Sequence, residues 1–242
     1  MPDWLYQYPS LLSGKLLKRY KRFLADIQLD TGEIVTAHCP NTGPMTGISK
    51  PNSRVQISKS DNPKRKLAYT WEMIEVCDSK PTWVGVNTHL PNVVVKELLQ
   101  QHLLPLDSYE HVKAEVRYGQ EKSRIDFLLT GSSKPIYVEV KSATWAQGEQ
   151  VLFPDTVTTR GQKHIRELVS LIPNARACLL FFINRGDCTT FAPGDQADPR
   201  YGELLRDAVA KGVEVLPCRF EIMPEEIRYL GLAKTEGVSE TR

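Results

Sequence analysis

Two acidic residues and a lysine at short spacing are the features of this sequence best suited to chemistry. Asp126 lies in the segment RIDFLLT (124–130). Glu139 and Lys141 lie two residues apart in the segment IYVEVKS (136–142). Both segments are rich in β-branched and aromatic residues, and a turn with Gly and Ser separates them, so they predict a β-hairpin. Since residues i and i+2 share one face of a strand, Glu139 and Lys141 point together, and the hairpin brings Asp126 beside them.

This set of charged groups suits the hydrolysis of a phosphodiester. Asp126 and Glu139 offer hard oxygen ligands for Mg²⁺, with Mn²⁺ as the alternative ion, while waters and phosphate oxygens complete the coordination. A bound cation lowers the pKa of a water and neutralises charge on the phosphate, and Lys141 can orient that water or stabilise the charge. The alternative is a surface salt bridge between Glu139 and Lys141, but charged groups in so apolar a strand need partners because burying them unpaired is costly.

Basic residues cluster with aromatic residues in the first part of the chain. Residues 1–80 hold 12 Lys and Arg against 8 Asp and Glu, whereas the whole chain holds 31 against 29. Cations neutralise phosphates and aromatic rings stack on bases, so these runs favour nucleic-acid binding, with a solvated charged face as the alternative. The candidates for this contact are Lys18, Arg19, Tyr20, Lys21 and Arg22 in one run, Lys64, Arg65 and Lys66 in a second, and Lys122 and Arg124 in the turn before the predicted hairpin.

Two domains are predicted, a small β-barrel over residues 1–84 and an α/β domain over residues 85–242. Short alternating segments separated by turns are typical of a barrel, and the basic and aromatic residues favour an OB-like fold. These strands are expected at 22–30, 33–39, 54–58 and 69–76.

In the second domain, helices alternate with strands, which predicts a mixed sheet covered by helices, α/β in the domain and α+β overall. Asn92 is the expected cap of the first helix, and Val157 is expected on the apolar face of the second. The helices are expected at 88–104, 156–172 and 203–212, and the strands at 113–119, 124–130, 136–142, 177–184 and 213–222.

The composition excludes several classes of protein. Five Cys without a CxxC pair argue against a disulfide framework and against a four-thiolate zinc site. The longest apolar stretch is strand-sized, and the first ten residues lack the charge and the apolar region of a secretory signal. We therefore expect a soluble, cytoplasmic protein that does not contact membranes.

Several long segments together resemble one family. The spacing D-x12-E-x-K, set in a strand–turn–strand unit followed by a helix and a buried strand, resembles the core of the PD-(D/E)XK nucleases. Over nearly the whole chain, the sequence resembles the SfsA family, which is named for sugar fermentation stimulation. The segments that carry this resemblance are RYKRFLAD (19–26), HCPNTGPMTG (38–47), YGQEKSRIDFLL (118–129), YVEVKSAT (137–144) and FPDTVTTRGQKHIREL (153–168).

The resemblance implies an N-terminal OB-like domain, a restriction-endonuclease-like second domain, DNA binding and a regulatory role in sugar (maltose) metabolism. It also implies that Asp126, Glu139 and Lys141 form the nuclease site, although Ile125 stands where the pattern has Pro. An acidic residue on the first helix joins such sites, which makes Glu97 a candidate; its alternative is a solvated residue on the helix face.

The helix over residues 156–172 supplies further candidates through the same resemblance. Related nucleases use a Gln or Lys here to contact phosphate, so Gln162 and Lys163 are candidates for contact with nucleic acid. His164 follows them near the apolar face of the helix and is expected to be a core-edge histidine rather than a ligand.

Three functions compete at this stage. The first is a Mg²⁺-dependent nuclease acting on DNA, with RNA left open as a substrate. The second is a non-catalytic, non-specific DNA-binding transcriptional regulator of sugar fermentation genes. The third is a sugar-binding or scaffold protein. Both a monomer and a homodimer fit the sequence, since nucleases that cut two strands commonly dimerise.

Overall fold

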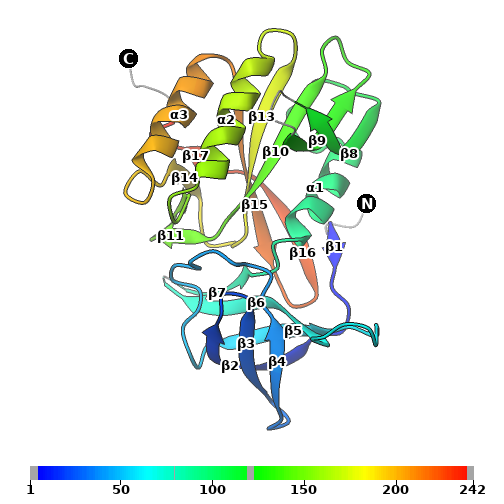
Figure 1. Ribbon diagram of the computed structural model, residues 1–242, viewed down its shortest axis with the longest axis vertical. Helices are drawn as coiled ribbons and strands as arrows, with labels where there is room; N and C mark the ends of the chain where they lie inside the picture. The colour runs from blue at the N-terminus through cyan, green and yellow to red at the C-terminus, as the bar shows by residue number, and fades with distance from the viewer. Residues whose placement is uncertain (1–4, 79, 119–122, 239–242) are drawn as a thin grey trace.

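A closed β-barrel forms the N-terminal part of the fold and lies below the second domain in Figure 1. The computed structural model describes residues 5–78, 80–118 and 123–238. Within them, the barrel strands follow the order β4-β3-β2-β5-β6, a parallel pairing of β4 with β6 closes the barrel, and β7 extends the sheet beyond β6. These strands are β2 (Leu12–Tyr20), β3 (Leu24–Leu29), β4 (Ile34–His38), β5 (Arg54–Lys59), β6 (Tyr69–Cys77) and β7 (Pro81–Gly85).

Alternation of apolar and polar residues builds the barrel core. In β3, Ala25, Ile27 and Leu29 are buried, whereas the residues between them face outward. The OB-like prediction is confirmed. Strand β2 was not predicted because its Lys and Arg residues hide the pattern, yet its Leu16 is fully buried. Strand β7 was also missed, since Pro81 opens it and was taken as a break.

A mixed sheet forms the centre of the second domain. Its order is β1-β16-β15-β13-β10-β9-β8 among the described residues, with β10, β13 and β15 parallel to one another and the flanking pairs antiparallel. The predicted mixed α/β sheet is therefore confirmed. Its strands are β1 (Tyr6–Gln7), β8 (His111–Tyr118), β9 (Ser123–Thr130), β10 (Ile136–Ala143), β13 (Arg176–Ile183), β15 (Glu214–Ile222) and β16 (Glu226–Leu232).

Helices cover both faces of this sheet. Along β13, Cys178, Leu180 and Phe182 pack in one cluster with helix α1 (Leu90–Gln100). The alternate residues of β13 pack with α2 (Thr159–Leu171) and α3 (Pro199–Ala210), which lie side by side in Figure 1. Burial on both faces explains why residues 177–184 read as one continuous apolar run.

Two details of the predicted helices were wrong. Helix α1 begins after His89, and Asn92 lies inside its first turn with its side chain on another partner. Val157 precedes α2 and is 62% exposed, while the Thr158 side chain caps that helix by accepting from the Gly161 N–H.

A small sheet and the chain termini complete the second domain. The small sheet contains β11 (Trp145–Gln147), β12 (Gln150–Phe153), β14 (Thr190–Pro193) and β17 (Lys234–Thr235). Strand β1 pairs with β16, so Tyr6 and Gln7, which precede the barrel in sequence, belong to the main sheet. No helix in the described part of the chain is long and apolar enough to cross a membrane.

Direct contacts join the barrel to the second domain. Gly85 N–H donates to the Asn184 carbonyl, and a Cβ at Gly85 would lie 2.1 Å from the Asn184 amide oxygen. Arg185, only 1% exposed, binds both carboxylate oxygens of Asp187 and reaches Asp78 in the barrel at 2.7 Å. These contacts hold the two domains in one orientation.

Candidate active site

Asp126 stands where strands β9 and β10 separate. Their ladder runs from Ile136–Leu129 to Val138–Phe127, and at the next position the Asp126 carboxylate takes the place of a backbone acceptor. Its Oδ2 accepts from the Val140 N–H at 2.7 Å, and its Oδ1 accepts from the Asn92 amide at 2.8 Å. Asp126 is thus held between β10 and helix α1.

Glu139, Lys141 and His164 meet on the α2 side of β10. Lys141 Nζ lies 2.7 Å from Glu139 Oε1, and His164 Nδ1 hydrogen-bonds the same oxygen. Arg160 Nε donates to His164 Nε2 at 3.4 Å, so that nitrogen is the acceptor of the ring and Nδ1 carries the proton that points at Glu139. Helix α2 therefore orients the Glu139 carboxylate and leaves Oε2 as its second, buried oxygen.

The two carboxylates titrate in opposite directions. Burial and the neighbouring charge of Glu139 raise the pKa of Asp126 above its usual range. Burial also acts to raise the pKa of Glu139, but the hydrogen bond from His164 and the charge of Lys141 outweigh it and hold that pKa below its usual range. Surroundings that drive the pKa values of two nearby acids apart are typical of catalytic and metal-binding sites.

A pocket of about 410 Å³ opens over these groups. Asp126 and Glu139 lie at its base, and Arg124 and Lys163 are basic residues of its wall. The other lining residues are Glu115, Ser123, Arg160 and His164. A basic wall around two acids suits a polyanionic ligand that approaches through a cation.

The donor set fits a divalent cation such as Mg²⁺. Glu139 Oε2 is buried and has no hydrogen-bond partner among the described residues, and Asp126 oxygens retain lone pairs beside their single partners. No group of three His, Cys, Asp or Glu arranged for a metal occurs in the described residues. Two carboxylates nevertheless suffice for Mg²⁺, which keeps several waters and takes its remaining ligands from phosphate.

Two predicted site residues do not reach the pocket. The Glu97 carboxylate accepts from Gln101 at 2.8 Å and does not line the pocket; Asn92, five residues earlier and about 140° around the helix, is the residue that α1 contributes. The Gln162 amide binds both carboxylate oxygens of Asp198 at 3.0 Å, so it links α2 to the start of α3.

Sequence reasoning missed three residues that support the site. Asn92 was taken for a helix cap, and His164 for a core-edge histidine, although each contacts one of the two acids. Arg160 was passed over. The i, i+4 spacing of Arg160 and His164, on the helix that follows the acidic strand, was the available signal.

The predicted nucleic-acid residues on the barrel have different roles. Arg19 donates to the carbonyls of Asn41 and Gly43 and so braces that loop rather than facing outward. Lys18 is 67% exposed and pairs with Asp26 at 3.4 Å, and the Tyr20 hydroxyl donates to the same carboxylate.

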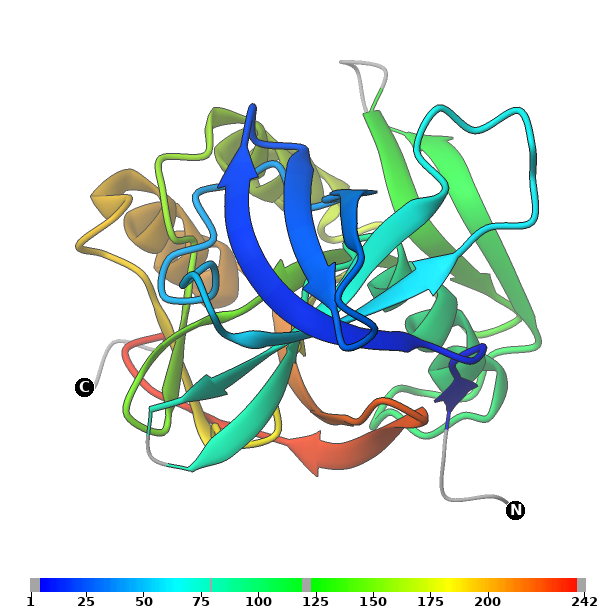
Figure 2. The same ribbon diagram turned by 90° about the horizontal axis from the view of Figure 1, so that it is seen from below.

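The remaining predicted cations lie in turns. Lys21 and Arg22 form the β2–β3 turn, both with positive φ. Lys64, Arg65 and Lys66 lie in the β5–β6 loop, where Arg65 donates to Thr70. Lys122 lies outside the described residues. Figure 2 shows the end of β2, the β5–β6 loop, the ends of β8 and β9 and helix α2 on one side of the molecule, at the top of the view.

Comparison with known proteins gives matches along nearly the whole chain. The family model described as "SfsA N-terminal OB domain" matches residues 17–86, and that described as "Sugar fermentation stimulation protein RE domain" matches residues 89–226. The "Sugar fermentation stimulation protein homolog" of Acaryochloris marina is 76% identical over 243 residues and 100% of both chains. The protein of the same description from a Cyanothece species is 68% identical over 96% of this chain and 98% of its own.

A solved structure agrees with these matches. The structure described as Pyrococcus furiosus SfsA in complex with Ca²⁺ superposes with a TM-score of 0.87 at 28% sequence identity, and the match covers 97% of this chain and 100% of that one. On these grounds, the chain belongs to the SfsA family, whose relatives are described as sugar fermentation stimulation proteins.

Proposed function

We propose that this protein is a divalent-metal-dependent nuclease acting on DNA, with RNA as a further substrate to be tested. The observation that carries the proposal is the convergence of Asp126 and Glu139 on one pocket, with Lys141 hydrogen-bonded to Glu139. Two acids and a lysine beside a basic wall are poorly suited to binding a polyanion unless a cation lies between them.

Each residue of the pocket has a definite task in this proposal. Asp126 and Glu139 would hold Mg²⁺ or Mn²⁺, which lowers the pKa of a water and neutralises charge on the phosphate when bound. His164 keeps the Glu139 carboxylate in place through its Nδ1–H. Lys141 is within reach of a water beside Glu139 and can orient it for in-line attack. Arg124 and Lys163 stand where they can contact phosphates on either side of the scissile bond.

Two observations from outside the pocket support the proposal. The description of the Pyrococcus furiosus relative states a complex with Ca²⁺, a hard cation that prefers the same oxygen ligands. The basic β2–β3 turn and β5–β6 loop also project to the side that carries α2 and the ends of β8 and β9 (Figure 2). A nucleic-acid strand running across this side would meet the barrel and the pocket together.

A second candidate is a DNA-binding regulator of sugar metabolism that does not cut. The described residues offer two acids but no third metal ligand of the usual types, which fits a site that binds phosphate through a cation without hydrolysing it. The family description, sugar fermentation stimulation, is compatible with either function.

Cleavage of labelled DNA and RNA with Mg²⁺, Mn²⁺ or EDTA tests the proposal. Wild type is compared with Lys141→Ala and with a matched control, Lys134→Ala, whose ammonium contacts only the Pro173 carbonyl at the exposed β9–β10 turn. We expect metal-dependent cleavage that falls about a hundredfold or more in Lys141→Ala and is unchanged in the control. Binding without cleavage on every substrate would favour the regulator instead.

A further inference from the structure

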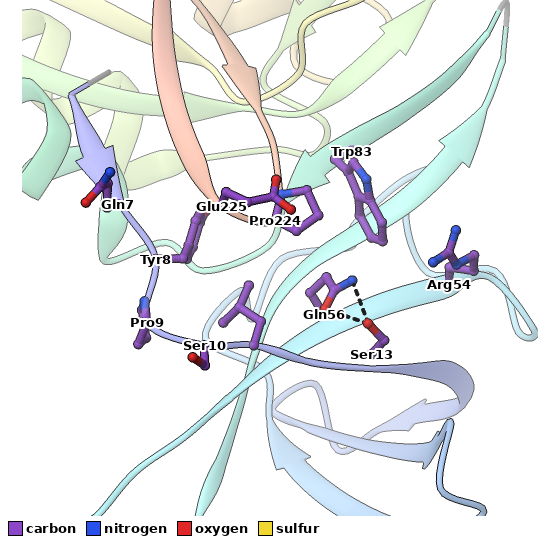
Figure 3. A pocket seen from close by; sticks show the side chains of 11 residues that line it. Gln7, Tyr8, Pro9, Ser10, Ser13, Arg54, Gln56, Trp83, Pro224 and Glu225 are labelled. Atoms are coloured by element: carbon purple, nitrogen blue, oxygen red, sulfur yellow. Dashed lines mark hydrogen bonds between the residues drawn. The ribbon is translucent and has the colours of Figure 1, made fainter. Parts of the chain in front are cut away.

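The largest groove of interest lies at the junction of the two domains, apart from the proposed active site. It has a volume of about 720 Å³, within the size range of small-molecule sites. Its walls come from three places: the segment that joins β1 to β2, barrel strands β5 and β7, and the β15–β16 turn with Glu225 (Figure 3). Strands β1 and β16 lie low in Figure 2, on the opposite side from α2.

An aromatic ring forms the apolar part of this groove. Trp83 on β7 is half-buried, its ring packs on the core below the main sheet, and the rest of its side chain lines the groove. The Arg54 guanidinium lies 5.9 Å from the indole centroid. The groove therefore offers one flat apolar surface with a hydrogen-bond donor at its edge.

The rest of the lining is polar and arranged to hydrogen-bond. Gln56 is only 5% exposed, and its amide both donates to and accepts from the Ser13 hydroxyl, at 3.0 and 3.2 Å. An amide has two donors and two acceptor lone pairs, so each end of Gln56 retains one further hydrogen bond. The Ser13 contact fixes the plane of the amide beside the groove (Figure 3).

The charges of the groove are balanced. Arg54 and Glu225 are the ionised residues among its described lining residues. A phosphorylated or strongly anionic ligand would meet Glu225, and a cationic one would meet Arg54. A purely apolar ligand would bury the Gln56 amide without partners, at a cost. The groove suits a neutral ligand that has one apolar face and many hydroxyl groups.

We propose that this groove binds a neutral saccharide of one or two pyranose rings. The C–H face of a pyranose packs flat on an indole, while its equatorial hydroxyls pair with planar amide, guanidinium and carboxylate groups. Trp83 supplies the platform, and Gln56, Arg54, Ser13 and Glu225 supply the hydrogen bonds. This site is independent of the proposed nuclease function, because no lining residue belongs to the metal pocket.

Tryptophan fluorescence of the full chain tests the proposal. Glucose, galactose, maltose and lactose are each titrated to about 50 mM, well above a dissociation constant of about 1 mM, and uridine and adenosine are titrated as planar competitors. We expect at least one saccharide to give a saturable change in emission and to raise the melting temperature. The nucleosides are expected to give neither effect.

Variants locate the response. Trp83→Phe is expected to lose the emission change, and Arg54→Ala, an exposed substitution that leaves the core intact, to weaken affinity about tenfold. Trp145→Phe is the matched control, since Trp145 lies in a different pocket, and it should bind as wild type does. The proposal is overturned if no saccharide binds, if Arg54→Ala binds as tightly as wild type, or if a nucleoside binds in preference to every saccharide.

Discussion

Asp126 has two roles that two substitutions can separate. Its carboxylate accepts hydrogen bonds from the Val140 N–H and from Asn92, and it is also a proposed metal ligand. Asp126→Asn keeps an acceptor for Val140 and, with the Asn92 amide turned, a hydrogen bond to Asn92, but removes the charge. Asp126→Ala removes both acceptors.

The expected free energies follow from these contacts. Asp126→Ala leaves a backbone N–H unpaired in a buried strand, which costs about 1–3 kcal/mol and lowers the melting temperature by about 2–12 °C for a chain of this size. Asp126→Asn is expected to be as stable as wild type or more stable in EDTA. The reason is that the raised pKa of Asp126 means that the fold disfavours its charge, so wild type loses stability as the pH rises through that pKa and the Asn variant does not.

Urea unfolding in EDTA and in Mg²⁺ measures both roles. Wild type should gain about 2.7 kcal/mol at a Mg²⁺ concentration a hundred times the dissociation constant, and neither Asp126 variant should gain. Asp26→Asn is the matched control, because Asp26 accepts from Tyr20 and Thr36 in the barrel and should leave the Mg²⁺ response intact. The reasoning is refuted if Asp126→Asn responds to Mg²⁺ as wild type does, or if both Asp126 variants are equally destabilised in EDTA.

Three further predictions concern the parts that hold the site together. Arg185→Met strands the buried Asp187 charge and should lower the free energy of unfolding by about 3–5 kcal/mol in urea titrations; a loss below about 1 kcal/mol would contradict the buried pairing. Gly85→Ala pushes a methyl group into Asn184 and should cost about 1–3 kcal/mol by the same method, whereas a neutral effect would show that the domain contact yields. Hydrogen bonds from two backbone amides and a glutamine outweigh burial and hold the pKa of Asp198 below its usual value, so its stabilisation is present above about pH 4 and is lost as the pH falls further. The stability difference between wild type and Asp198→Asn, followed by thermal melts against pH, should therefore narrow in acid; a constant difference would count against this.

The periodicity of the sequence was enough to predict the layout of both domains. Alternation in segments such as 24–29 identified barrel strands, and the apolar run at 177–184 identified a strand buried on both faces. Strand β2 escaped because long basic side chains can cover a strand face without being buried, so composition outweighs pattern there. The pairing of Glu139 with Lys141 was also local, since it depends on a spacing of two along one strand.

The contacts that complete the site were decided by the tertiary structure. His164 reaches Glu139 across 25 positions of sequence, and Asn92 reaches Asp126 across 34. Arg19, in contrast, turned from a phosphate contact to a brace for a loop more than twenty residues away. Periodicity shows which face of an element is buried but not which element covers it. The partner of a polar side chain therefore depends on how helices and strands pack, and that is settled only when the whole chain folds.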